Sequence, residues 1–150
     1  MASAAIVFVD TSVLLYASDV RVPDKQKAAA NWLAWCWQQQ AGRISTQVLN
    51  ELYVNLRRLA PSMSVNEARA FVRRYRAWAP WVVEESTVDE AWALQDRFQF
   101  SYWDALMVAA ALHQRCTVLL TEDLQHCLQV DGLQILSPFH APVPDSRSSS

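Results

Sequence analysis

The sequence predicts an α/β protein built on a parallel sheet that helices cover on both faces. Short apolar runs rich in β-branched residues alternate along the chain with longer helical patterns, which is typical of parallel strands joined by helical crossovers. The first apolar run, "IVFV", lacks polar alternation, as expected for a strand buried on both faces. With 150 residues, 52% of them hydrophobic, the chain has the size of one domain with a substantial core.

The first part of the chain is expected to contain two strands and two long helices. Gly42 ends the first long helix, Thr46 caps the second, and the segment Ala60–Pro61–Ser62 breaks it. The expected elements are a strand at 5–9, a short helix or turn at 11–18, a helix at 24–41, a strand at 43–45 and a helix at 47–59.

Three pairs with the spacing of a capping box mark helix starts in the rest of the chain. These pairs are Ser64 with Glu67, Thr87 with Glu90, and Ser101 with Asp104. The first of these helices is expected to stop near Pro80. Between and after the helices the apolar runs predict three strands, at 81–85, 117–121 and 133–136.

Composition excludes several classes of protein. The chain is expected to form one domain over 1–140 and a disordered tail over 141–150, which is rich in proline and serine. No run approaches the roughly 20 apolar residues that span a membrane, and the N-terminus lacks the features of a secretory signal. Only two glycines are present, which argues against phosphate-binding and dinucleotide-binding loops.

Charge and cysteine usage favour a cytoplasmic protein that does not span a membrane. The net charge of -2 does not exclude nucleic acid, because the local distribution of charge matters more than its total. The three cysteines are odd in number and form no CxxC pair, so they are interpreted as buried thiols in a reducing compartment. A zinc site that uses His126 and Cys127 is the less favoured alternative.

Four acids far apart in the sequence are expected to meet at one edge of the sheet. Asp10 and Asp123 each follow an expected strand, so they lie at its carboxyl end. Glu51 is early in a helix that leaves a strand, and Asp104 is in the first turn of a helix that returns to one. Both of these helices begin at the carboxyl edge, where ligands of parallel sheets bind.

Each acid also has a structural alternative when it is considered alone. Asp10 can cap the next helix, Glu51 can lie on an exposed face, and Asp104 can complete a capping box. Asp123 can be a turn residue, with Glu122 as its rival. Four carboxylates held together destabilise a fold unless a cation neutralises them. Because the ligands are oxygen atoms, Mg²⁺ or Mn²⁺ is the expected cofactor.

Four segments in order resemble the motifs of the PIN-domain ribonucleases, and most closely the VapC-like toxins of type II toxin–antitoxin systems. The segments are "FVDTSVLLYASD", "STQVLNELYVNL", "YWDALMVAAAL" and "LLTEDL", and the resemblance covers about 5–137. It implies a three-layer α/β/α sandwich with a central parallel sheet, and metal-dependent cleavage of RNA. It also implies a homodimer and a cognate antitoxin protein that covers the acidic site.

The resemblance maps the catalytic site onto Asp10, Glu51, Asp104 and Asp123. Thr11 or Ser12, together with Thr121, fall at the supporting hydroxyl positions. We expect Asp10 and Asp104 to be the principal metal ligands and Asp123 to bind the metal directly or through water. Glu51 is expected to bind a second ion or to orient the attacking water.

Arginines in two adjacent expected helices are candidates for binding the RNA backbone. They are Arg57, Arg58, Arg73, Arg74 and Arg76. The structural alternative is a solvated helix face. Trp32 and Trp35 have helical spacing, so a place in the core or in a protein interface is favoured over base stacking.

Proteins of two other classes, one enzymatic and one a signalling module, also have an acid directly after the first strand. A haloacid-dehalogenase-like phosphoryl-transfer enzyme needs a second acid where this chain has Ser12. A receiver-like signalling module needs a lysine at the end of the last strand, where this chain has "LSP". A non-catalytic protein whose acidic pocket binds a basic partner is the remaining alternative.

Overall fold

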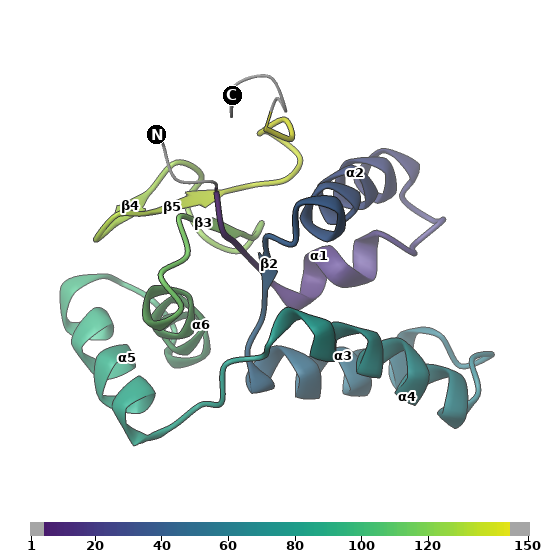
Figure 1. Cartoon of the computed structure of the whole chain (residues 1–150), viewed down its shortest axis with the longest axis horizontal. Helices are drawn as coiled ribbons and strands as arrows, with labels where there is room; N and C mark the ends of the chain where they lie inside the picture. The colour runs from purple at the N-terminus through teal and green to yellow at the C-terminus, as the bar shows by residue number, and fades with distance from the viewer. Residues whose placement is uncertain (1–4, 145–150) are drawn as a thin grey trace. The chain divides into compact units, whose positions relative to one another are not determined.

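The computed structural model describes residues 5–144, which pack as two compact units (Figure 1). The first unit contains residues up to Gly42 together with those from Cys116 onward, and the second contains Arg43–Arg115. The outer residues of the expected tail, 145–150, lie outside the described residues. No helix in the described part of the chain is long and apolar enough to cross a membrane.

The predicted α/β/α class is confirmed by a five-stranded, mostly parallel sheet with helices between its strands. The strand order is β2-β1-β3-β5-β4. The strands are β1 (Val7–Val9), β2 (Gly42–Arg43), β3 (Val118–Leu120), β4 (Gln129–Val130) and β5 (Leu133–Leu136). β1 pairs with β3 and β3 with β5 in parallel, whereas β4 and β5 are antiparallel. The sheet is therefore mixed rather than wholly parallel.

The register of the three parallel strands determines which residues follow them at one edge. Val9 is paired with Leu120, and Leu120 with Leu136. The ladder continues for one more hydrogen bond on each side, from the Asp10 N–H to the Leu120 carbonyl and from the Thr121 N–H to the Leu136 carbonyl. Asp10 and Thr121 are thus neighbours at the carboxyl ends of β1 and β3.

Two helices complete the first unit, α1 (Thr11–Tyr16) and α2 (Pro23–Gln39). The buried side chains of α2 recur at the spacing of a helix face that meets a core. They are Ala29, Trp32, Leu33 and Cys36. The Trp32 indole N–H donates to the Ala141 carbonyl at 3.0 Å, so Trp32 belongs to the core, as its spacing indicated.

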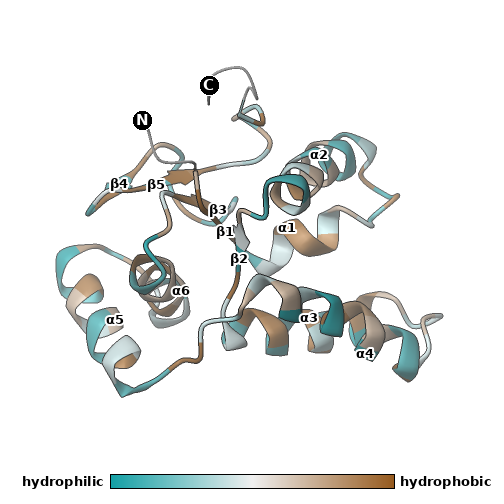
Figure 2. Cartoon of the chain, in the orientation of Figure 1, coloured by the Kyte–Doolittle hydropathy of each residue, from teal (hydrophilic) through white to brown (hydrophobic). Residues whose placement is uncertain are grey.

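The second unit is helical. It contains α3 (Thr46–Leu59), α4 (Val65–Arg74), the 3₁₀ turn η1 (Tyr75–Trp78), α5 (Glu85–Arg97) and α6 (Tyr102–His113). α6 packs along α5, and α3 along α4 (Figure 1). These helices differ in hydropathy (Figure 2). α6 is apolar over most of its length, and its residues 105–111 are all buried. α4 has only Ala68 buried, so most of its surface meets solvent.

Several predicted boundaries differ from the structure. The expected strand at 81–85 is reduced to one bridge between Ser45 and Trp81, because α5 already begins at Glu85. The expected pairing of Thr87 with Glu90 is wrong. Thr87 is instead the third residue of a capping box with Glu84, and its hydroxyl also accepts from the Trp81 indole N–H at 3.0 Å.

The other helix starts agree more closely with prediction. The capping box of Ser64 and Glu67 is confirmed. Ser101 caps α6 by accepting from the Asp104 N–H at 3.1 Å. Ser45 rather than Thr46 caps α3, and its hydroxyl accepts from the Val48 N–H.

Candidate active site

The Asp10 carboxyl group lies at the carboxyl end of β1 and is turned toward β3. Asp10 is only 7% exposed, and its side chain makes no capping hydrogen bond to α1. Instead, its Oδ2 accepts from the Thr121 hydroxyl at 2.8 Å and from the Ser12 hydroxyl at 3.4 Å. Burial of a carboxyl group is costly, so a helix cap does not explain this position.

Thr121 connects two of the predicted acids. Its hydroxyl is fully buried, donates to Asp10 and accepts from the Asp123 N–H at 3.1 Å. One side chain therefore orients the Asp10 carboxylate and anchors the backbone of Asp123, which is itself exposed. At the start of α1, the Ser12 hydroxyl donates to Asp10, and Thr11 is buried at the first position of the helix.

Glu122, the rival of Asp123, has a structural role. Its Oε2 accepts from the Lys25 ammonium on α2 at 2.9 Å. Burial alone would raise the pKa of Glu122, but hydrogen bonds from Lys25 and Tyr16 outweigh it, so the pKa is lowered. The hydrogen bond to Glu122 in turn raises the pKa of Lys25. This pairing ties the loop after β3 to α2 and leaves Asp123 as the candidate ligand.

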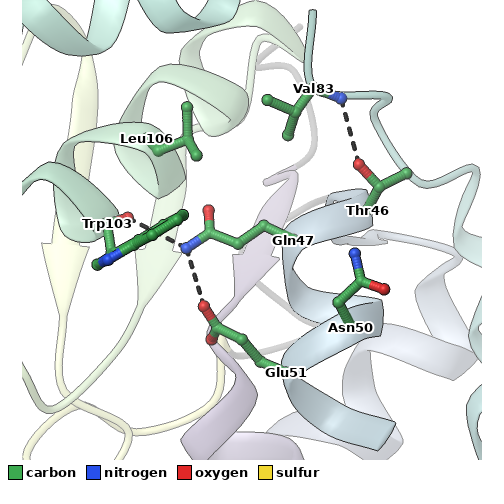
Figure 3. Close-up of a pocket in the computed structure, with 7 residues that line it drawn as sticks. All are labelled: Thr46, Gln47, Asn50, Glu51, Val83, Trp103 and Leu106. Carbon is green, nitrogen blue, oxygen red and sulfur yellow. Dashed lines mark hydrogen bonds between the residues drawn. The ribbon is translucent and has the colours of Figure 1, made fainter. Parts of the chain in front are cut away.

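The second unit contains the other two predicted acids, and Gln47 connects their surroundings. The Gln47 amide nitrogen donates to Glu51 Oε1 at 2.9 Å and to the Trp103 carbonyl at 3.3 Å (Figure 3). Trp103 directly precedes Asp104 in the first turn of α6. Gln47 therefore fastens α3 to the start of α6 and places Glu51 at the same end of the second unit as Asp104. Both acids are half-buried.

A pocket of about 510 Å³ opens beside Glu51 (Figure 3). Glu51 lines it together with Thr46, Gln47, Asn50, Val83, Trp103 and Leu106. Gln47, Asn50 and Trp103 were not predicted from the sequence as site residues. The available signals were the i, i+4 spacing of Gln47 and Glu51 on one helix and the position of Trp103 beside Asp104.

The predicted arginines divide into two groups. Arg73 and Arg76 line a groove of about 260 Å³ between α3 and α4, which Arg69, Tyr53 and Asn50 also line. Arg57 donates instead to the Met63 carbonyl, Arg58 to Asn55, and Arg74 lies over the Phe71 ring. Arg69 was missed, although it precedes Arg73 by one helical turn.

The donor set at the predicted acids fits a hard divalent cation. The groups around Asp10 are hydroxyl and carboxylate oxygens, which Mg²⁺ and Mn²⁺ prefer. No group of three or more histidine, cysteine, aspartate and glutamate side chains lies within reach of one ion among residues 5–144. His126, the ligand of the less favoured zinc alternative, accepts a hydrogen bond from the Ser137 N–H at 2.9 Å.

Comparisons with known proteins give one family. The sequence pattern of the PIN domain matches residues 7–131. No curated protein sequence matches the chain. Solved structures also share the fold, and three of them are 20% identical to this chain or less.

A toxin–antitoxin complex from Klebsiella pneumoniae aligns with a TM-score of 0.62 and 15% identity, over 88% of this chain and 97% of the other. VapBC2 from Rickettsia felis, bound to a promoter DNA fragment, aligns with a TM-score of 0.59 and 13% identity, over 88% of this chain and 98% of the other. VapC20 from Mycobacterium tuberculosis, a toxin that cleaves the sarcin–ricin loop, aligns with a TM-score of 0.51 and 20% identity, over 75% of this chain and 86% of the other.

Proposed function

Because this chain belongs to the PIN-domain family, we propose that it is a metal-dependent endoribonuclease, the toxin component of a toxin–antitoxin pair. The observation that carries the proposal is the buried Asp10 carboxylate, held by Thr121 at the carboxyl end of β1. A carboxylate that is buried, oriented by hydroxyl groups and not used as a helix cap is typical of a metal ligand with its supporting hydrogen bonds.

We assign Asp10, Asp104 and Asp123 as ligands of Mg²⁺ or Mn²⁺. When bound, such an ion lowers the pKa of a water molecule and neutralises charge on the phosphodiester. Thr121 keeps the Asp10 oxygens in one orientation and fixes the backbone of Asp123. Gln47 holds one oxygen of Glu51, so that Glu51 can orient the attacking water or hold a second ion.

The arginine groove is the proposed contact for the RNA backbone. Arg69, Arg73 and Arg76 line it from α4 and η1, and all three side chains are exposed. Guanidinium groups bind phosphate oxygens in pairs and attract a polyanion over a distance. Arg57, Arg58 and Arg74 have the contacts within the chain described above, so we expect them to contribute less than the groove arginines.

A cognate antitoxin and a homodimer are the proposed partners. One of the similar structures is a toxin–antitoxin complex, which supports an antitoxin here. Large apolar side chains are exposed on this chain as well, among them Val54 at 62% and Val82 at 60%, which suits contacts with another protein. The three free cysteines suit the reducing cytoplasm, where we propose that the protein acts.

Cleavage mapping on total cellular RNA tests the proposal. The purified chain should produce a small number of discrete cuts with Mg²⁺ or Mn²⁺ and none with EDTA. Cuts of equal intensity in EDTA would contradict the metal-dependent mechanism. No cuts with either metal would favour the non-catalytic, receiver-like or acidic-pocket alternative.

A further inference from the structure

The pocket beside Glu51 has features that metal binding does not explain. Trp103, Val83 and Leu106 form apolar walls (Figure 3), whereas a metal site needs only oxygen ligands. Trp103 is 63% exposed, an unusual position for so large an apolar side chain. The pocket has a volume of about 510 Å³, which lies within the range of about 300–1,000 Å³ that is typical of ligand pockets.

The pocket also contains a hydrogen-bond acceptor without a partner. The Gln47 nitrogen faces two acceptors, Glu51 Oε1 and the Trp103 carbonyl, which fixes the orientation of the amide. The Gln47 Oε1 atom is thereby turned away from Glu51 toward Leu106 (Figure 3). This oxygen is buried and receives no hydrogen bond from the described residues. A buried acceptor of this kind is stabilised by a ligand that donates an N–H.

Charge decides which part of an RNA the pocket suits. Glu51 lines the pocket and repels a phosphate, but it does not repel an uncharged base. The adjoining groove contains Arg69, Arg73 and Arg76 and shares Asn50 with the pocket. Along α3, a site for an uncharged ring is therefore followed by a site for phosphates.

We propose that this pocket binds one unpaired nucleobase of RNA, stacked on Trp103 and donating an N–H to Gln47 Oε1, with the adjacent phosphates in the arginine groove. This inference rests on the proposed ribonuclease function and adds to it a subsite for one unpaired base beside Glu51. A base inside a duplex is stacked on both faces, so it cannot offer a face to Trp103 and its edge to Gln47. An aliphatic side chain from a protein partner would fill the apolar walls but leave Gln47 Oε1 without a donor.

Binding of a short, fluorescently labelled single-stranded RNA to the full chain in EDTA tests this inference without cleavage. Trp103→Ala should weaken binding by about 5- to 150-fold, the loss expected for one stacked base. Trp103→Phe should retain most of the affinity. The matched control is Trp92→Ala, because Trp92 on α5 is also exposed, at 55%, and does not line the pocket; its affinity should equal that of the wild type.

A series of RNAs with one abasic nucleotide at a time makes the test specific for a base. For the wild type, one abasic position should cost about as much affinity as Trp103→Ala does. The Trp103→Ala variant should bind the RNA that is abasic at this position as tightly as it binds the intact RNA, because both changes remove the same contact. Duplex RNA of the same sequence should bind more weakly than the single strand at equal salt.

Three outcomes would overturn the inference: equal RNA affinity of Trp103→Ala and wild type, no costly abasic position, or no binding of single-stranded RNA. Loss of antitoxin binding by Trp103→Ala with unchanged RNA binding would identify a protein as the occupant and overturn it too. Since the assay contains no metal, its result is separate from the nuclease proposal. A chain that binds RNA as described but never cuts it with Mg²⁺ would refute only the nuclease.

Discussion

Replacing Thr121 by valine removes one hydroxyl group and nearly preserves the volume of the side chain. The structure predicts two losses. Asp10 Oδ2 loses the hydrogen bond at 2.8 Å, and the Asp123 N–H loses its acceptor at 3.1 Å. Because Thr121 is fully buried, water cannot replace its hydroxyl group at Asp10 without rearrangement of the core.

The expected destabilisation follows from the charge of the acceptor. A hydrogen bond to a charged group contributes about 1.5–3 kcal/mol to stability, and the exposed Asp123 can recover its bond from water. For a chain of this length, such a loss lowers the melting temperature by about 3–12 °C. If Asp10 is a metal ligand, loss of its orienting partner should also weaken metal affinity or activity by about 10- to 100-fold.

Thr87→Val is the matched control for this substitution. Thr87 is also fully buried and also takes part in two hydrogen bonds, from the Trp81 indole N–H and the Glu84 N–H, but both donors are uncharged. Two neutral hydrogen bonds contribute about 1–3 kcal/mol together. The two variants should therefore lose similar stability in EDTA, measured by thermal melting followed by circular dichroism.

The variants should differ in their response to metal. Wild type and Thr87→Val should melt higher in Mg²⁺ than in EDTA and cut RNA at similar rates well below their melting temperatures. Thr121→Val should lose most of the Mg²⁺ response and of the cleavage rate. Equal Mg²⁺ responses of Thr121→Val and Thr87→Val would mean that Thr121 is a structural residue only and does not orient a metal ligand.

Three further outcomes are expected. With an assumed Kd of about 1 mM, about 10 mM Mg²⁺ should stabilise the wild type by about 1.4 kcal/mol, a melting shift of about 3–6 °C that would be absent if no site exists. The lowered pKa of Glu122 means that its contact with Lys25 adds stability above the ordinary pKa of 4.5 and loses it as pH falls below that value. Glu122→Gln should therefore melt below wild type at neutral pH, and the difference should vanish in acid; a difference that persists there would contradict the pairing. Burial raises the pKa of Cys36 to about 12, so a thiol reagent at pH 8 should label the exposed Cys127 in the native protein and leave Cys36 unlabelled until denaturation; rapid labelling of Cys36 in mass spectra would contradict its burial.

The sequence predicted the elements whose signals are local and strong. The strand at 133–136 and the capping box of Ser64 and Glu67 agree with the structure residue by residue. The apolar run before Asp10 correctly predicted a buried strand followed by an acid. In each case the side-chain pattern and the backbone preference favour the same conformation, and the tertiary contacts of the folded chain agree with it.

Other features depend on contacts that the spacing of residues does not reveal. The run at 81–85 has strand composition, but the hydrogen bonds of Thr87 start α5 early and leave only Trp81 to pair. The antiparallel β4 was not predicted, although Asp131–Gly132 carried a signal. Both residues have positive φ, 48° and 88°, as in the two-residue turns of hairpins.

In the candidate site, too, some positions follow from local sequence signals and others depend on contacts between distant residues. The positions of Asp10 and Thr121 follow from strand ends, which sequence can locate. The choice between Asp123 and Glu122 required the contact with Lys25, 97 residues away in the chain. The pocket of Trp103 likewise required the packing of α6 beside α3, which no local pattern encodes.

Single-turnover cleavage of RNA by site variants tests whether the predicted acids form a metal-dependent nuclease site. Asp10→Asn and Asp104→Asn each keep the size of the side chain and remove its charge. A control acid is Asp96 on α5, which is exposed and outside the site. Asp10→Asn and Asp104→Asn should abolish Mg²⁺-dependent cleavage with unchanged circular dichroism, while Asp96→Asn should cut like the wild type. Undiminished cleavage by either Asp10→Asn or Asp104→Asn would contradict a nuclease site at these acids.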